Sequence, residues 1–356
     1  MLNQRQDAAR RDPTELRAAW LGFRETNPDV RIRDAAAALE VSEAELVATG
    51  VGATATRLRP EWREIVEALP MLGTVMALTR NEYAVHEKVG QYREIQINAH
   101  GGVVLDPDID LRLFFSRWHH AFAVVDPGDK GPRRSLQIFD SDGTAVHKIH
   151  LRADSDVAGF DALIVRFAAE EQKPGIAVSP RPAPAADRPD SAIDAEALRK
   201  DWQALRDTHD FFSLLKRHEV GRVQSFRLVG SDLARSIPSG CFSRALGLAA
   251  AEEVPIMVFV GSPGVIQIHG GPIKTVKRMG PWQNVMDPGF NLHLREDCIE
   301  SCWLVRKPTD DGVVTSIEIF DKTGQQIAWM FGQRKPGQPE RADWVRLAGQ
   351  AASEAH

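Results

Sequence analysis

Cysteine is scarce in this chain of 356 residues, and no long apolar run occurs in it. Cys241, Cys298 and Cys302 form neither CxxC nor CxxCH, which excludes a disulfide framework, a four-cysteine zinc site and covalent c-type haem attachment. Buried free thiols are the favoured interpretation, although Cys298 and Cys302 are four residues apart and could share a helix face. No stretch reaches the ~18 to 20 consecutive apolar residues of a membrane helix, and the first twenty residues lack the apolar run of a secretory signal. We therefore expect a cytoplasmic protein that is not embedded in a membrane.

Several functional classes lack their motifs here. The sequence has no GxxxxGK[ST], no GxGxxG after a strand, no GxSxG and no HExxH, and the GSPG of residues 261–264 is typical of a hairpin turn. The formal net charge of −5 has the opposite sign to that of most nucleic-acid-binding chains, so we expect no nucleic-acid partner. With 43% hydrophobic and 26% charged residues, the composition is that of a globular protein.

The most informative feature is an internal repeat. LRAAWLGFRETNPD, beginning at Leu16, matches LRKDWQALRDTHDF, beginning at Leu198 (198 − 16 = 182). SLQIFDSDGTAV, beginning at Ser135, matches SIEIFDKTGQQI, beginning at Ser316 (316 − 135 = 181). A nearly constant offset over such a distance indicates that the chain arose by tandem duplication.

A proline- and alanine-rich stretch, KPGIAVSPRPAPAADRPDSA, separates the two copies and is typical of a semi-rigid linker. We predict an N-terminal repeat at residues 1–172, a linker at 173–195 and a C-terminal repeat at 196–356. Each copy begins with helical periodicity and continues with alternating strand patterns, and Ser42 with Glu45 predicts a capping box. The DSDG of residues 140–143 predicts a hairpin turn. The expected fold class is α+β, with helices packed on a large antiparallel sheet in each half.

The copies differ at two positions that carry chemistry. His209 stands where the first copy has Asn27, and Arg112 stands where the second copy has His293. An imidazole beside apolar side chains suits ligation of haem iron, but His209 by itself also fits a helix-capping or solvent-exposed histidine. Asp207 and Asp210 are near enough in sequence to orient the ring. Arg112 fits a donor that points into a pocket, or equally an edge charge that pairs with Asp110.

The remaining histidines form no ligand pattern for a metal ion bound by protein side chains. His119 and His120 are adjacent, and His147 and His150 are three apart, so on regular strands each pair would point to opposite faces. His86 has no second histidine at a ligand spacing, and no zinc or 2-His-1-carboxylate pattern occurs.

The sequence resembles the bacterial haemin-degrading factor family, whose members are cytoplasmic haem-handling proteins encoded with haem-uptake systems. The matching segments include RNEYAVHEKVG, DLRLFFSRW, DTHDFFSLLKRHEVGRVQSF, IMVFVGSPGVIQIHGG and FGQR, in order through both halves. The resemblance implies that His209 is the axial ligand of haem iron, that Arg112 lies on the distal side, and that Phe114 and Phe212 contact the porphyrin. It assigns the haem propionates to four polar or basic residues: Arg222, Lys307, Gln333 and Arg334. Many relatives have tyrosine where this chain has Phe331, so a hydrogen bond from that position is in doubt.

The resemblance implies a protein of haem trafficking and iron acquisition. Haem b is the expected ligand, one per chain, because Asn27 is no substitute for His209. Possible partners are a haem oxygenase that receives the haem and an inner-membrane haem importer. The alternative is a haem oxygenase-like monooxygenase that degrades its bound haem, with Arg112 then a catalytic residue.

Overall fold

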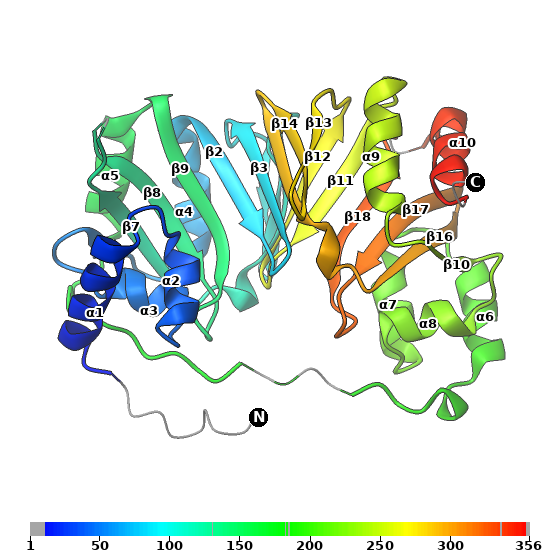
Figure 1. Ribbon diagram of the computed structural model, residues 1–356, viewed down its shortest axis with the longest axis horizontal. Coiled ribbons are helices and arrows are strands. Elements are labelled where there is room, and N and C mark those ends of the chain that lie inside the picture. Colours follow the sequence, from blue (N-terminus) through cyan, green and yellow to red (C-terminus); the bar gives the residue numbers. More distant parts are fainter. Residues whose placement is uncertain (1–10, 130, 182, 184–185, 335–336, 354–356) are drawn as a thin grey trace. The chain divides into compact units, whose positions relative to one another are not determined.

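The computed structural model describes residues 11–129, 131–181, 183, 186–334 and 337–353. These residues form two compact units (Figure 1). Unit 1 contains the described residues within 1–80, 87–183 and 262–267, and unit 2 contains those within 81–86, 184–261 and 268–356. Each unit therefore includes a short segment from the other half of the sequence: residues 262–267 in unit 1 and residues 81–86 in unit 2. The units are thus not contiguous in sequence.

The first half of the chain follows the order helices, sheet, helix. Its helices are α1 (Pro13–Thr26), α2 (Ile32–Ala38), α3 (Glu43–Ala48), α4 (Trp62–Ala68) and α5 (Val157–Phe167), with 3-10 turns η1 (Leu69–Leu72) and η2 (Phe115–Arg117). Its strands are β1 (Ala55–Arg57), β2 (Gly73–Arg80), β3 (Ala84–Gly90), β4 (Ile95–Ile97), β5 (Gly101–Leu105), β6 (Asp110–Phe114), β7 (His120–Asp126), β8 (Arg133–Phe139) and β9 (Ala145–Ser155).

The second half repeats this order. Its helices are α6 (Ala195–Gln203), α7 (Asp210–Arg217), α8 (Arg222–Leu228), α9 (Cys241–Ala251) and α10 (Ala342–Ala351), with 3-10 turns η3 (Asp190–Ala192) and η4 (Glu296–Cys298). Its strands are β10 (Ala234–Ile237), β11 (Ile256–Gly261), β12 (Val265–Gly271), β13 (Val276–Met279), β14 (Trp282–Asp287), β15 (Phe290–Arg295), β16 (Ser301–Thr309), β17 (Gly312–Phe320) and β18 (Gln326–Gly332).

The strand orders confirm the duplication. The first half has the order β1-β7-β8-β9-β2-β3, and the second half has the equivalent order β10-β16-β17-β18-β11-β12. The pairs whose registers are known within them are antiparallel. Each half also has an antiparallel three-stranded order, β4-β5-β6 or β13-β14-β15. The predicted α+β class is thus confirmed, as are the hairpin of residues 140–143 and the Ser42–Glu45 capping box.

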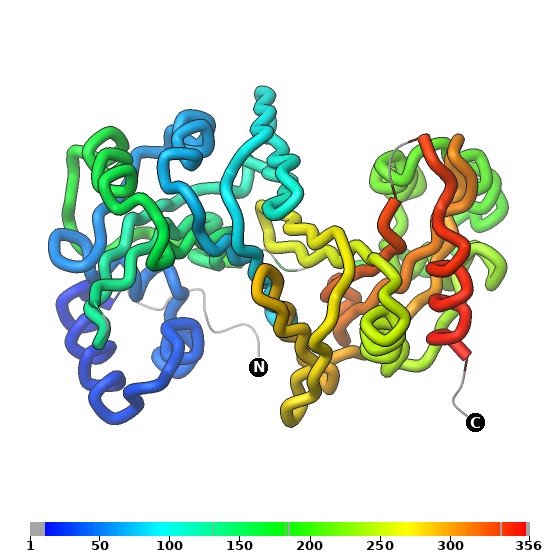
Figure 2. The backbone as a smooth tube through the Cα atoms, turned by 90° about the horizontal axis from the view of Figure 1, so that it is seen from above, coloured from blue at the N-terminus to red at the C-terminus, as the bar shows by residue number. Residues whose placement is uncertain are grey.

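In unit 2, apolar side chains cover both faces of the sheet. One face packs against α9 and α10, which lie side by side in Figures 1 and 2. The opposite face packs against α6, α7 and α8 around Trp202, Phe226 and Trp303. In unit 1, helix α3 packs on one sheet face and α1 and α2 pack on α3, whereas α4 and α5 pack on the other sheet face. This layering fixes α7, the helix that follows His209, on one face of the second sheet.

The predicted linker makes specific contacts on both sides of residues 182, 184 and 185, which lie outside the described residues. In unit 1, Arg57 donates to the carbonyl groups of Lys173 and Gly175, and the Ser179 amide donates to Ser141. In unit 2, the side chain of Gln224 donates to the Arg188 carbonyl and to Asp190. Much of the proline-rich stretch is therefore bound along the two units.

The cysteines are free thiols. Cys241 and Cys302 are buried, as expected, whereas Cys298 is half-exposed. Cys298 lies in η4 and Cys302 in β16, so the two do not share a helix face.

Candidate functional site

His209 is an exposed histidine at the start of α7, in unit 2. Its side chain is 83% exposed, and its Nδ1 lies 2.6 Å from Oδ1 of Asp207. The same Oδ1 accepts the backbone N–H of His209 at 2.8 Å. Although His209 is the N-cap residue, its side chain makes no capping hydrogen bond. The alternative of a helix-capping histidine is therefore wrong, and the ring is instead held by Asp207 at its edge.

Helix α7 presents different side chains to the core and to solvent. Phe211, Leu214 and Leu215 are buried, because their spacing places them on the face that packs into the unit 2 core. Phe212 points the other way and is 74% exposed. The apolar surface next to His209 on this helix is therefore the ring of Phe212, whereas Leu214 and Leu215 belong to the core. An exposed phenylalanine beside an exposed imidazole is unusual for packing and suits contact with a ligand.

Four aromatic or apolar side chains share one face of β11 and β18 in the same unit. The pairs Met257–Phe331 and Phe259–Trp329 lie opposite each other across the two strands. Phe259 stacks on Trp329 with ring centroids 5.3 Å apart, and contacts Phe331 edge-on at 5.2 Å. All four are only half-buried. Sequence reasoning did not single out Phe259 or Trp329, although the alternation in IMVFVG and AWMF could have indicated this face.

Next to these rings lies a buried ionic network centred on Glu318 of β17, directly opposite Trp329. Glu318 accepts hydrogen bonds from Lys307 at 2.6 Å, Arg222 at 2.9 Å and Ser316 at 2.9 Å. Burial raises the pKa of Glu318, but the charges and hydrogen bonds of Arg222 and Lys307 outweigh it and lower the value to about 2. The carboxylate is thus ionised near neutral pH.

The positions of Lys307 and Arg222 bear on their expected role toward a ligand. Lys307 is 3% exposed, and burial lowers its pKa in spite of the attraction of Glu318. Both cations also lie over the Phe211 ring, at 4.6 Å and 5.1 Å from its centroid. To bind a ligand carboxylate, either cation would have to share it with Glu318.

Arg334 is a different kind of cation. It is 22% exposed, and its Nη1 lies 3.6 Å from Asp311, with no hydrogen-bond partner for that buried nitrogen among the described residues. Arg334 lies two residues after the end of β18, the strand that carries Trp329 and Phe331. Gln333 precedes Arg334, and the backbone N–H of Gln333 donates to the Pro255 carbonyl. A buried guanidinium nitrogen without an acceptor suits an incoming carboxylate.

Arg112 and Phe114 lie on β6, in unit 1. Arg112 Nη1 donates to Asp110 and to the Leu111 carbonyl, so the pairing with Asp110 that the sequence left open is present. Burial raises the pKa of Asp110, and the charge of Arg112 opposes that shift. Phe114 is half-exposed, and its backbone N–H donates to the Gly264 carbonyl at 2.9 Å.

Unit 1 has different chemistry at the positions equivalent to the unit 2 site. Asn27 binds its own helix, donating to the Phe23 carbonyl at 3.0 Å. Its buried ionic cluster also joins one carboxylate to two cations, but the acid lies on a helix: Glu43 begins helix α3 and pairs with Lys148 and Arg80 from the strands. In unit 2, by contrast, the cation Arg222 begins helix α8 and the acid Glu318 lies on a strand.

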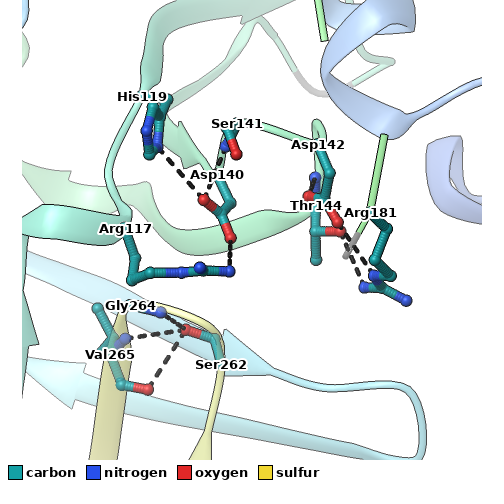
Figure 3. Close-up of polar contacts among 10 residues, drawn as sticks. All are labelled: Arg117, His119, Asp140, Ser141, Asp142, Thr144, Arg181, Ser262, Gly264 and Val265. Carbon is teal, nitrogen blue, oxygen red and sulfur yellow. Dashed lines mark hydrogen bonds and ion pairs between the residues drawn. The ribbon is translucent and has the colours of Figure 1, made fainter. Parts of the chain in front are cut away.

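Two further polar clusters in unit 1 are structural. Buried Asp140 binds Arg117, lies 3.3 Å from His119 and accepts the Ser141 amide at 2.7 Å (Figure 3). Nearby, Arg181 donates to Asp142 at 3.0 Å.

His147 is fully buried, with Nε2 2.6 Å from the Tyr92 hydroxyl, and burial lowers its pKa to about 3. These residues border a cavity of only about 10 Å³, which is too small for an organic ligand. His147 and His150 point to opposite faces of the sheet, as predicted. His147 lies opposite Ile138, which belongs to the core under α4 and α5, whereas His150 lies opposite Ser135.

Among the described residues, no group of three or more potential ligand side chains is placed to hold a metal ion. Within the same part of the chain, no helix is long and apolar enough to span a membrane.

Fold and site together define a class: a duplicated α+β protein in which one unit carries both an exposed histidine and a half-buried aromatic face. The chain belongs to the HemS/ChuX family, because the family model described as "Haemin-degrading HemS.ChuX domain" matches residues 40–167 and again residues 219–350. The resemblance noted from the sequence is thereby confirmed.

Individual relatives agree with this assignment. The chain is 41% identical to "Hemin transport protein HemS" of Yersinia enterocolitica over 329 residues, which cover 91% of this chain and 94% of that protein. It is 49% identical to holo-PhuS, "a heme-binding protein from Pseudomonas aeruginosa", with a TM-score of 0.93 and coverage of 95% and 98%. It is 36% identical to ChuS, "an E. coli Heme Oxygenase", with a TM-score of 0.86 and coverage of 95% and 100%.

Proposed function

We propose that this protein binds haem b through His209 and carries it within the cytoplasm for haem utilisation and iron acquisition. The observation that carries the proposal is the His209 ring, which is 83% exposed, held at Nδ1 by Asp207 and free of any hydrogen bond at Nε2 within the described part of the chain. A histidine that ligates iron needs an open nitrogen on one side and an acceptor on the other. The names of the relatives HemS and PhuS point to the same ligand.

The surroundings in unit 2 suit the two chemical faces of haem. Phe212 supplies exposed apolar surface next to His209, and the strand that carries Phe331 is followed directly by Gln333 and Arg334. We propose Arg334 as the main partner of a propionate, since its Nη1 has no hydrogen-bond acceptor among the residues that the structure describes. Gln333, Arg222 and Lys307 remain proposed further partners, the last two in competition with Glu318. Phe331 has no hydroxyl and contributes packing alone.

Arg112 and Phe114 remain proposals for the distal side of the haem. Arg112 is half-buried, and its guanidinium has donors beyond the one that Asp110 uses. When bound, haem would supply an iron centre able to take a small ligand such as water or dioxygen. In a carrier, Arg112 would hold that small ligand in place by a hydrogen bond. In an enzyme, the same hydrogen bond would polarise the ligand.

A haem titration followed by absorbance tests the proposal. We expect the wild type to bind one haem per chain. In His209→Ala we expect the Soret band to shift and the affinity for haem to fall. His100→Ala is the matched control, because His100 is an exposed histidine of unit 1. An unchanged spectrum and affinity in His209→Ala would remove His209 as the ligand, and His218 and His86 would then be examined. Two haems per chain would contradict the assignment to the second copy.

The second candidate function is haem oxygenase-like degradation, which the similarity to the haem oxygenase ChuS favours. An assay distinguishes the carrier from the enzyme. Haem-loaded protein is supplied with a reductase and oxygen in the presence of catalase. Release of a defined tetrapyrrole together with iron would show an enzyme, and Arg112→Ala should then slow it. Bleaching that catalase abolishes would show a carrier whose haem is attacked by free peroxide.

The proposed partners are a haem oxygenase that receives the haem and an inner-membrane importer that delivers it. Transfer is measured by mixing loaded protein with each candidate and following the Soret spectrum over time. A rate that does not depend on acceptor concentration would indicate release into solution and would contradict direct hand-over. Cell fractionation tests the cytoplasmic location.

A further inference from the structure

Two carboxylates flank His209 in sequence, and the structure distinguishes them. Asp207 Oδ1 lies 2.6 Å from Nδ1 of the ring, the length of a charge-assisted hydrogen bond. Asp210 begins α7 and makes no side-chain hydrogen bond to the ring. Asp210 is the nearer acid in sequence, but only Asp207 is placed to act on the imidazole.

The hydrogen bond fixes which ring nitrogen carries the proton. An ionised carboxylate only accepts hydrogen bonds, and a neutral imidazole has a single N–H. In the neutral ring Nδ1 is therefore the donor, and Nε2 carries the lone pair. The second bond of the same oxygen, to the backbone N–H of His209 at 2.8 Å, keeps the carboxylate in place.

Two contacts with His209 hold the Asp207 carboxylate in place. Its Oδ1 accepts the backbone N–H of His209 at 2.8 Å and lies 2.6 Å from Nδ1 of the ring. The ring itself is 83% exposed, so no packing in unit 2 fixes its orientation. The geometry leaves that task to one carboxylate.

We propose that Asp207 is a positioning residue, which keeps the His209 proton on Nδ1, presents Nε2 to the iron and strengthens the iron–histidine bond. The inference rests on the proposed function. A carboxylate on the far nitrogen makes imidazole a stronger donor, and loss of such a partner typically weakens metal binding ~10- to 100-fold. The first copy lacks the histidine, so this device belongs to the second copy alone.

The test compares Asp207→Ala with Asp210→Ala, which removes the same charge three residues away. In the haem-free protein, ¹⁵N-resolved NMR of the histidine rings reports the tautomer, with His209→Ala identifying the signal. We expect an Nδ1–H ring in the wild type and in Asp210→Ala, and a ring with substantial Nε2–H in Asp207→Ala. A wild-type ring protonated mainly at Nε2 would overturn the inference.

The haem-bound protein supplies the second measurement. In Asp207→Ala we expect ~10- to 100-fold weaker haem binding and a lower iron–histidine stretching frequency of the ferrous protein, with neither change in Asp210→Ala. Identical iron–histidine frequencies in Asp207→Ala and the wild type would refute the role of Asp207. A changed spectrum in His209→Ala would still identify His209 as the ligand in that case. An unaltered spectrum in His209→Ala would instead overturn the proposed function, and the inference with it.

Discussion

Replacing Glu318 by glutamine should destabilise unit 2 strongly, because it leaves Lys307 as a buried cation without a counter-ion. Glu318 is fully buried, and its carboxylate binds Lys307 and Arg222. The fall of its pKa from 4.5 to about 2 corresponds to about 3 kcal/mol at ~1.4 kcal/mol per pH unit. Removal of one partner of a buried pair typically costs ~3 to 5 kcal/mol. The two figures agree, and we expect a loss of about 3 kcal/mol near neutral pH.

The dependence on pH follows from the direction of this shift. A carboxyl group whose pKa is lower in the folded state stabilises the fold above its unfolded pKa. The contribution of Glu318 should therefore be complete above about pH 5, and should decline as the pH falls from 4.5 toward 2. The difference in unfolding free energy between the wild type and Glu318→Gln should shrink over that range.

Denaturant unfolding of the haem-free protein, measured at several pH values, provides the assay. The control is the double variant Glu318→Gln with Lys307→Met, since replacing a whole buried pair by apolar or neutral groups is often close to neutral. It should recover most of the lost stability. The reasoning is refuted if Glu318→Gln lies within ~0.5 kcal/mol of the wild type at pH 7, or if the double variant is no more stable than the single one.

Three other changes have defined outcomes. Arg334→Gln should weaken haem binding ~10-fold or more, the value of a hydrogen bond to a charged group, and the effect should disappear with haem dimethyl ester; equal losses for both ligands would contradict a propionate contact. Gly332→Ala should destabilise the fold by ~1 to 3 kcal/mol, because the added Cβ would overlap the side chain of Trp344, and an unchanged melting temperature would be evidence against this packing. Gly349→Ala, where a Cβ meets nothing within 4 Å, should instead stabilise α10 by ~0.5 to 1 kcal/mol, as calorimetry can show.

The sequence predicted the repeated architecture because hydrophobic periodicity and turn residues are local signals. The offset between copies, the alternating strands and the DSDG hairpin each required only neighbouring residues. The segments 81–86 and 262–267 gave no such signal. Their place in the opposite unit depends on contacts such as Gln267 with Thr79 at 2.8 Å, between residues far apart in the chain.

The candidate site was predictable only in its unusual residue. Comparison of the two copies singled out His209 against Asn27, because a chemical difference between duplicates is visible without coordinates. The aromatic face of Phe259 and Trp329 was not visible in this way. Its residues are ordinary strand residues until two strands bring them to one side.

The amino-acid sequence by itself determined that the chain is a duplicated α+β protein with one distinctive histidine. Tertiary structure decided which partner each charged group found: Asp207 rather than Asp210 for His209, and Glu318 rather than open solvent for Lys307. Secondary structure follows from periodicities of a few residues, which a sequence displays directly. Ion pairs and ring orientations depend on ångström-scale distances between segments far apart in the chain, such as Arg222 and Glu318, 96 residues apart, which only the folded chain fixes.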